Sequence, residues 1–294
     1  MFGFRSRRIS AARTRFADDL AQRRALPAAL RDAFAAVPRE RFLPRGPWLV
    51  LEGAAGYEST PDADPTRVYR DSAIAIDAAR LLNSSQPSLA AGILAALEIR
   101  SGETVVHVGC ASGYYTAIVA ELVGAHGRVI GFEISPAIAS WAKRSLRGWR
   151  QVELRQADAL DGALPQADVV WIDAGVTQLR EAWLDALRPG GRLALPLTAV
   201  RAAVRAPRFT RNHIGRVLFV RREPAGLRAH FGEGVAIMGL HGGRDAQEQR
   251  LLDAAYRQGG WERVRSLRRD PHEPEATCWV HLGAVCLSLR EPIG

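Results

Sequence analysis

Two short segments of the chain carry residues that could bind and position a small polar ligand. The first is NSSQP, Asn83–Pro87, and the second is TVVHVGCASGYYTA, Thr104–Ala117. In the second segment an apolar run ends in a turn that contains Gly109 and Gly113, and an amphipathic stretch follows. A strand that ends in small residues lets the next helix begin close to the backbone, which leaves free N–H groups for a nucleotide-like ligand. The serines and the glutamine of the first segment could line the reactive end of that ligand.

Two carboxylates follow at the ends of the next expected strands. Glu133 ends a strand over Arg128–Glu133, where a carboxylate can accept hydrogen bonds from both hydroxyls of a ribose. Asp158 follows a strand over Val152–Gln156, where it could accept from an adenine amino group. The turn is not G-x-G-x-x-G, so the dinucleotide fingerprint is not matched. The alternative interpretation of both carboxylates is a surface position at a strand end.

The elements that must position these residues alternate along the chain. The expected strands are Thr104–Gly109, Arg128–Glu133, Val152–Gln156, Asp168–Asp173 and the segment RLALPL that follows Pro189–Gly191. The expected helices are Ser88–Ile99, Gly113–Val123, Pro136–Leu146 and Leu179–Leu187. This alternation predicts an α/β fold, with a mostly parallel sheet and helices on both faces.

The flanking regions have other patterns. Arg8–Ala36 has helical spacing that ends before Pro38 and Pro44, and Trp48–Arg67 has no clear period and reads as loop. After the core, Gly215–Arg222 and Leu227–Phe231 predict a β-hairpin, followed by a helix over Asp245–Gln258 and a final strand pair. We therefore expect an N-terminal helical and irregular region (1–80), a ligand-binding core (81–240) and a C-terminal extension (241–294).

Composition fits a globular enzyme of 294 residues. No apolar run reaches the length of a membrane span, and the basic N-terminus is not followed by the apolar stretch of a secretory signal. The three cysteines do not suggest a disulfide framework. These observations favour a location in the reducing cytoplasm and argue against a membrane partner.

The formal net charge of +9 comes almost entirely from arginine, since Lys143 is the only lysine. Ala186–Arg222 has no Asp or Glu and is rich in arginine, so it is a candidate surface for an acidic partner such as RNA, through Arg201, Arg205, Arg208 and Arg211. Charge runs are more often solvated faces and strand edges. We therefore do not expect a nucleic-acid partner.

His272, Cys278, His281 and Cys286 lie close enough in sequence to raise the question of a metal site. If Cys278–Leu289 is one strand, Cys278 and Cys286 share a face and His281 points to the other. There is also no C-x-x-C pair. The sequence therefore predicts no metal site.

The ordered set of glycine turn, Glu133, Asp158 and LRPGGRLALP resembles the class I S-adenosylmethionine-dependent methyltransferases. FAAVPRERFLP, VYRDSAIAI, NSSQP and GYYTA together resemble the protein-L-isoaspartate O-methyltransferase family, from about residue 30 to about residue 200. The resemblance implies a Rossmann-like methyltransferase fold, S-adenosyl-L-methionine as cofactor, and carboxyl O-methylation of a peptide or protein.

The resemblance also assigns site residues. Ser85 falls on the family's serine near the methyl acceptor and is the expected catalytic residue. The expected cofactor-binding residues are Ser84, Gln86, His107, Val108, Gly109, Cys110, Gly113, Tyr114, Glu133, Ile134, Asp158, Ala159 and Asp173. The alternative for the serines is that Ser84, Ser85 or Ser88 caps the helix that begins near Pro87.

Several positions depart from the family pattern. His107 stands where the family usually has an acidic residue, Ala111 replaces the second glycine of the turn, and Asp173 follows the fourth strand. His107 is either a core histidine or a group near the amino-acid end of the cofactor. Asp173 either caps the following segment or compensates for His107 by orienting the cofactor amine or the acceptor. The C-terminal extension is not part of the small members of the family.

The favoured prediction is therefore an O-methyltransferase of the isoaspartate type that acts on a peptide or protein carboxylate. One alternative is a methyltransferase of the same fold with another acceptor, a ribosomally made peptide or a small acid. Another is a non-catalytic protein that binds the cofactor or RNA. No oligomeric state follows from the sequence.

Overall fold

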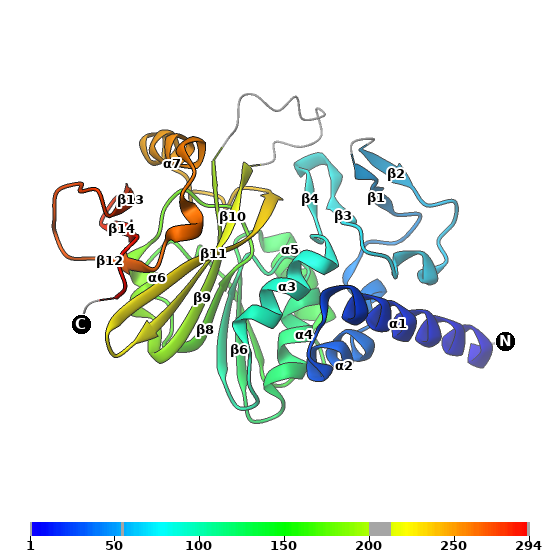
Figure 1. The fold of residues 1–294 in the computed structure, drawn as a ribbon. Coiled ribbons are helices and arrows are strands. Elements are labelled where there is room, and N and C mark those ends of the chain that lie inside the picture. Colours follow the sequence, from blue (N-terminus) through cyan, green and yellow to red (C-terminus); the bar gives the residue numbers. More distant parts are fainter. Residues whose placement is uncertain (1, 54–55, 200–212, 293–294) are drawn as a thin grey trace. The chain divides into compact units, whose positions relative to one another are not determined.

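The computed structural model describes residues 2–53, 56–199 and 213–292. The contacts between Cα atoms divide these residues into two compact units. The first unit takes the described residues up to 102 and residues 110–156. The second takes residues 103–109, 157–199 and 213–292. Figure 1 follows the chain from the blue N-terminal helices to the red C-terminal strands.

The first unit combines N-terminal helices, a region of short strands and a parallel strand pair. Its α-helices are α1 (Phe2–Arg24), α2 (Ala28–Ala36), α3 (Pro87–Leu97), α4 (Tyr114–Val123) and α5 (Pro136–Ser145). Its strands are β1 (Leu49–Leu51), β2 (Tyr57–Ser59), β3 (Ala75–Asp77), β4 (Leu82–Asn83), β6 (Arg128–Glu133) and β7 (Val152–Gln156). β6 and β7 pair in parallel, α4 packs on β6, and α5 packs on both strands. The predicted strand–helix alternation is confirmed here.

The N-terminal helical region is two helices and not one run from Arg8 to Ala36. α1 ends at Arg24 and α2 begins at Ala28. Pro27 has no backbone N–H and disfavours the helical conformation at the residue before it, Leu26. The chain turns at Ala25, which has a φ of 49°. The break lets α2 bury its own apolar face, including Phe34.

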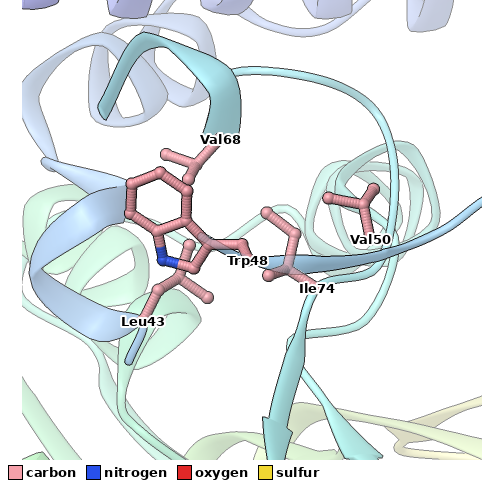
Figure 2. Packing of buried hydrophobic residues seen from close by; sticks show 5 residues of the cluster. All are labelled: Leu43, Trp48, Val50, Val68 and Ile74. Atoms are coloured by element: carbon pink, nitrogen blue, oxygen red, sulfur yellow. The ribbon is translucent and has the colours of Figure 1, made fainter. Parts of the chain in front are cut away.

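The prediction of a loop over Trp48–Arg67 is wrong, because β1 and β2 form an antiparallel hairpin there. A small apolar cluster of Leu43, Trp48, Val50, Val68 and Ile74 accompanies it, as Figure 2 shows. These side chains come from separate short segments, so their burial leaves no periodic pattern in the sequence. Within this region β3 pairs with β4, which leads directly into the NSSQP segment.

One buried arginine connects these short segments. Arg39 is fully buried, and its guanidinium donates hydrogen bonds to the carbonyl oxygens of Val68 (2.8 Å), Arg70 (2.7 Å) and Ser72 (2.8 Å). It also donates to Oγ of Ser84 at 3.1 Å. A guanidinium presents five N–H donors in one plane, which suits it to hold several acceptors at once. The segment 68–72 and the serine motif are therefore fixed to the same side chain.

The second unit is built on one mixed sheet with the strand order β13-β14-β12-β11-β10-β9-β8-β5. Its strands are β5 (Thr104–Val108), β8 (Ala167–Ile172), β9 (Leu187–Ala199), β10 (His213–Glu223), β11 (Gly226–Ile237), β12 (Ser266–Arg268), β13 (Cys278–Leu282) and β14 (Val285–Ser288). Its α-helices are α6 (Glu181–Asp185) and α7 (Ala246–Gln258). β5, β8 and β9 are parallel, and the strands from β10 onward pair antiparallel.

Most predictions for this unit are confirmed. The hairpin around EPAG is the long ribbon of β10 and β11 in Figure 1, and α7 begins where the sequence predicted it. Asp245 caps α7, because its carboxylate accepts from the N–H groups of Gln247 and Glu248. The helix expected over Leu179–Leu187 is shorter, since the chain is already extended from Leu187. The division at residues 80 and 240 stays a prediction.

Among the described residues, no helix combines the length and apolar character needed to cross a bilayer.

The role of Arg39 predicts a large loss of stability for Arg39→Met. Methionine keeps the apolar stem but removes four hydrogen bonds. The carbonyls of Arg70 and Ser72 lose their guanidinium donor, whereas the Val68 carbonyl and Ser84 Oγ keep a backbone N–H donor. The free energy of unfolding should therefore fall by about 3 kcal/mol or more. Chemical denaturation measures this change. The control is Arg45→Met at an exposed arginine, where we expect a change within about 0.5 kcal/mol. Equal stability of the two variants would show that Arg39 is not the link described here.

Candidate functional site

The glycine turn of the sequence is a sharp reversal between β5 and α4. Gly109, Ala111 and Gly113 have φ values of 77°, 47° and 94°. Glycine adopts these left-handed conformations at little cost, whereas alanine does so at about 1 kcal/mol. A Cβ at Gly113 would also lie 2.9 Å from the side chain of Leu146. The turn ends at the N-terminus of α4, whose first N–H groups are free of intrahelical partners.

Glu133 fixes this turn to the end of β6. One carboxylate oxygen accepts from the Ala111 N–H at 3.1 Å, and the other accepts from the Ser135 N–H at 2.9 Å. The side chain is buried, whereas the neighbouring Ile134 is 43% exposed. A carboxylate has about four acceptor sites and can accept several hydrogen bonds at once. Glu133 thus orders the turn, and Ile134 offers an apolar surface beside it.

His107 and Asp173 lie together at the ends of neighbouring parallel strands, β5 and β8. Nε2 of His107 is 3.9 Å from Oδ2 of Asp173, and both side chains are buried. The imidazole stacks on Trp171, with ring centroids 4.2 Å apart and planes 1° apart. Burial raises the pKa of the Asp173 carboxyl, and His107 opposes that rise. The backbone N–H of Asp173 donates to the Val108 carbonyl at 2.9 Å, so the residue continues the strand ladder.

Asp158 lies at a tight turn in the second unit. Its Oδ1 accepts from the Leu160 N–H at 2.9 Å. Ala159 is buried, and its carbonyl accepts from the indole of Trp183 at 3.5 Å. A cleft of about 370 Å³ begins beside this turn and is lined by Ala159, Leu160 and Trp183, among others. The adenine contact of Asp158 stays a prediction.

The serines of NSSQP have different environments. Ser84 is buried, and its hydroxyl accepts from Arg39 and from the Ile74 N–H at 3.2 Å. Ser85 is half-buried with a φ of 51°. Its N–H donates to Asn83 at 2.9 Å and its carbonyl accepts from the Tyr115 hydroxyl at 3.4 Å. In the part of the chain that the structure describes, the Ser85 hydroxyl has no hydrogen-bond partner.

The alternative that one of these serines caps α3 is wrong. Gln86 is the residue at the N-cap, and its side chain makes no capping bond. Asp71 does the capping from a distant segment, since its carboxylate accepts from the Ser88 N–H at 2.8 Å and from the Gln86 amide at 3.3 Å. Sequence reasoning missed Asp71, which lies within VYRDSAIAI but carries no local capping signal.

Three other predicted cofactor residues have packing roles. Val108 and Cys110 are buried in the turn region. Tyr114 is buried in the first unit, where its ring lies 6.4 Å from that of Phe34 and 5.8 Å from that of Phe42. Whether these residues also contact a cofactor, through backbone or side chain, stays a prediction.

In the described part of the arginine-rich stretch, arginine side chains contact other residues of the same chain. Arg192 pairs with Glu103 at 2.6 Å, and Arg188 pairs with Asp168 at 2.8 Å. The guanidinium of Arg216 lies 3.5 Å from the ring centroid of Trp261. Arg201, Arg205, Arg208 and Arg211 lie outside the described residues.

The expectation that the four C-terminal histidines and cysteines do not converge is wrong. The ligand atoms of His272, Cys278, His281 and Cys286 all lie within 4.8 Å of one another. Cys278–Leu289 is not one strand, because the chain reverses between β13 and β14 and thereby returns Cys286 to the neighbourhood of His281. The prediction that His281 points away from the two cysteines assumed a single strand, so it does not apply to a chain that reverses.

Comparisons with known proteins identify the family. The family model of protein-L-isoaspartate(D-aspartate) O-methyltransferase matches residues 13–223. A protein-L-isoaspartate O-methyltransferase from Methanopyrus kandleri is 35% identical over 146 residues, which are 48% of this chain and 64% of that relative. The aligned segment thus spans just under two thirds of the relative's own length.

Solved structures agree on the fold. A structure titled protein-L-isoaspartate O-methyltransferase has a TM-score of 0.63 at 23% identity, with 83% of this chain and 69% of that chain covered. A Plasmodium falciparum protein assigned to the same family, in complex with S-adenosyl-L-homocysteine, has a TM-score of 0.59 at 15% identity, with coverages of 78% and 97%. The fold is that of the class I methyltransferases, Rossmann-like as predicted. Because the family model spans most of its length, this chain belongs to the protein-L-isoaspartate O-methyltransferase family of S-adenosylmethionine-dependent enzymes.

Proposed function

We propose that this chain transfers a methyl group from S-adenosylmethionine to a carboxylate of a peptide or protein, with an isoaspartyl residue as the first candidate acceptor. The observation that carries the proposal is Ser85, whose backbone is held at both its N–H and its carbonyl while its hydroxyl has no partner among the described residues. Such a hydroxyl can donate to one oxygen of a substrate carboxylate and thereby direct the other. The family match supports the reaction class.

The cofactor residues proposed from the sequence remain Ser84, Gln86, His107, Val108, Gly109, Cys110, Gly113, Tyr114, Glu133, Ile134, Asp158, Ala159 and Asp173. Glu133 suits ribose hydroxyls because it is a buried carboxylate that two backbone N–H groups hold in place. Ile134 suits an adenine face because it is an exposed aliphatic side chain next to that carboxylate. Asp173 suits the cofactor ammonium because it supplies the negative charge that the family has at the position of His107.

The proposed methyl transfer needs little acid–base catalysis from the protein. S-adenosylmethionine supplies a methyl group that is already activated by its sulfonium. A substrate carboxyl group has a pKa of about 4 and is ionised at neutral pH, so no general base is needed. The remaining tasks are alignment and exclusion of water, which a fixed backbone at Ser85 and a donor hydroxyl can serve. The left-handed φ of Ser85 fits a residue whose conformation is imposed for function.

The test is incubation of the full chain with radiolabelled S-adenosylmethionine and a peptide that contains isoaspartate, followed by mild base. We expect label in the peptide that is released by base as methanol, because carboxyl methyl esters are labile. The matched control is the same peptide with ordinary aspartate, which should remain unlabelled. Binding of S-adenosylhomocysteine is measured on the same preparation. Binding without methylation of either peptide would exclude isoaspartate and direct the search to ribosomally made peptides and small acids, whereas no binding would overturn the whole proposal.

Ser85→Ala should reduce turnover strongly and leave cofactor affinity nearly unchanged. A charge-assisted hydrogen bond lost in a closed site corresponds to a rate reduction of about 30- to 150-fold. Single-turnover methylation and thermal unfolding on one preparation measure the two effects. Stability should hardly change, because the hydroxyl has no partner within the described chain.

Ser84→Ala is the matched control with the opposite expectation. It removes the acceptor of Arg39 and of the Ile74 N–H, so the free energy of unfolding should fall by about 1–3 kcal/mol. At saturating S-adenosylmethionine, turnover per folded molecule should stay within a few-fold of the wild type. A larger rate loss in Ser84→Ala than in Ser85→Ala would show that Ser84, and not Ser85, has the catalytic role.

Asp173→Asn should weaken S-adenosylhomocysteine binding tenfold or more at neutral pH, because a charge-assisted bond is worth about 1.5–3 kcal/mol. Burial raises the pKa of Asp173, so on acidification this carboxyl takes up a proton at a higher pH than an exposed aspartate. Wild-type affinity should therefore be full at higher pH and fall as the pH drops through the raised pKa. The affinity of the variant should lack that fall. Calorimetry at several pH values checks it.

His107→Gln tests whether the acid loss of affinity belongs to Asp173 itself. It removes the imidazole and retains the carboxyl, so the acid loss of affinity should persist. If wild type and Asp173→Asn lose affinity in parallel, Asp173 does not contact the ammonium.

We also propose that the enzyme works in the cytoplasm. All three cysteines are free thiols in the structure, which suits a reducing compartment. Cell fractionation tests this location.

A further inference from the structure

We propose that His272, Cys278, His281 and Cys286 form a structural zinc site in the C-terminal part of the chain, outside the methyltransferase machinery. Their four ligand atoms lie within 4.8 Å of one another, and all four residues belong to the second unit. Two thiolates and two imidazoles are the ligand set of closed, tetrahedral zinc sites. Thiolate ligands also select zinc over magnesium, calcium or manganese.

A β-bulge brings the strand ligands to one face. In the β13–β14 ladder, Cys278 pairs with Ser288 and His281 pairs with Cys286, with a register shift between Cys278 and Val280. Without the bulge, Cys278 and His281 would point to opposite faces, since they are three positions apart. The extra residue restores them to the same face, and Cys286 stands directly opposite His281. Three ligands therefore converge through backbone register alone.

His272 completes the set from the loop before β13, and its orientation is that of a metal ligand. Its Nδ1 lies 2.7 Å from the Asp270 carbonyl oxygen, so this nitrogen carries the proton and donates. The lone pair is then on Nε2, which faces Sγ of Cys278 at 3.4 Å. A zinc-bound histidine characteristically donates its second ring nitrogen to a carbonyl or carboxylate in this way.

The other ligand atoms have environments that suit a metal. Nε2 of His281 is buried, with no hydrogen-bond partner in the described part of the chain. Cys286 is buried, and Cys278 accepts an N–H···S contact from Glu275 at 3.4 Å. A buried, unsatisfied ring nitrogen is costly in a native fold, and a cation at the centre of the cluster removes that cost.

The geometry and the charge suit zinc better than a disulfide. Zinc–sulfur bonds of about 2.3 Å and zinc–nitrogen bonds of about 2.0 Å place tetrahedral ligand atoms about 3.3–3.8 Å apart, so the cluster needs to contract by about 1 Å. Two thiolates neutralise the cation, which suits a site beside the buried Leu282 and Leu287. A Cys278–Cys286 disulfide would not account for the two imidazoles that point toward the same cluster.

The site would stabilise a part of the chain that has little secondary structure of its own. β12, β13 and β14 are short, and the loop that carries His272 is otherwise held by exposed ion pairs such as Arg268–Asp270 and Arg268–Glu275. Exposed ion pairs contribute little. The turn after His281, from Leu282 to Ala284, lines the same cleft as Ala159 and Trp183. Zinc would thereby fix one wall of that cleft.

The direct test is the metal content of the untagged full chain after gel filtration. Elemental mass spectrometry should find one zinc ion per chain. Exchange for Co²⁺ should give the visible bands of a tetrahedral site together with a thiolate-to-cobalt charge-transfer band, a signature that requires cysteine ligands. Zinc removal by a chelator should lower the Tm, and added zinc should restore it.

Variants locate the metal. Cys286→Ser and His281→Asn should each reduce zinc content severalfold and change the cobalt spectrum. The matched controls are Cys110→Ser and His241→Asn, a cysteine and a histidine outside the cluster, which should retain one zinc.

Two results would overturn the proposal independently of how the variants fold. One is a wild-type chain that contains no zinc and gives no cobalt bands. The other is a Cys278–Cys286 disulfide found by mass spectrometry in protein purified under reducing conditions. Full zinc content in both Cys286→Ser and His281→Asn would equally contradict it.

Discussion

The N-terminal part of the methyltransferase depends on the hydrogen bonds of one buried guanidinium. Arg39 comes from FAAVPRERFLP, its three carbonyl acceptors come from the segment that contains VYRDS, and its hydroxyl acceptor is Ser84 of NSSQP. Three of the four sequence motifs that carry the family resemblance are thus one hydrogen-bonded assembly. A buried charge is costly unless it is hydrogen-bonded, and the two Nη atoms of this guanidinium make four hydrogen bonds.

The assembly determines which serine is available for chemistry. Because Ser84 is used by Arg39 and Ile74, and because Asp71 caps α3, the Ser85 hydroxyl is left without a structural duty. Glu133 has a structural role of its own, since one carboxylate orders both the glycine turn and the start of α5. In both cases the groups proposed for function are held by their backbone neighbours, which keeps the reactive atoms in place before a ligand arrives.

The C-terminal extension is stabilised in a different way. Its strands are short, and exposed ion pairs help to hold the loop that carries His272. Four metal-binding side chains meet at its centre through a bulge and a strand reversal. A cross-link of this kind is a common means of stabilising a small segment that has little core of its own. It would allow the extension to shape the cleft near Asp158 without enlarging the apolar core.

The sequence by itself determined the regular part of this protein. β6 and β7 have the predicted bounds, and β5, α4 and α5 differ from them by a residue at an end, because strand and helix periodicity is local. The resemblance correctly gave the family and the fold, while the cofactor residues stay predictions. Only the tertiary structure revealed the β1–β2 hairpin, the cap by Asp71 and the convergence of Cys278 with Cys286. Each of these depends on contacts between residues far apart in sequence or on a bulge that shifts register, and neither leaves a local periodic signal.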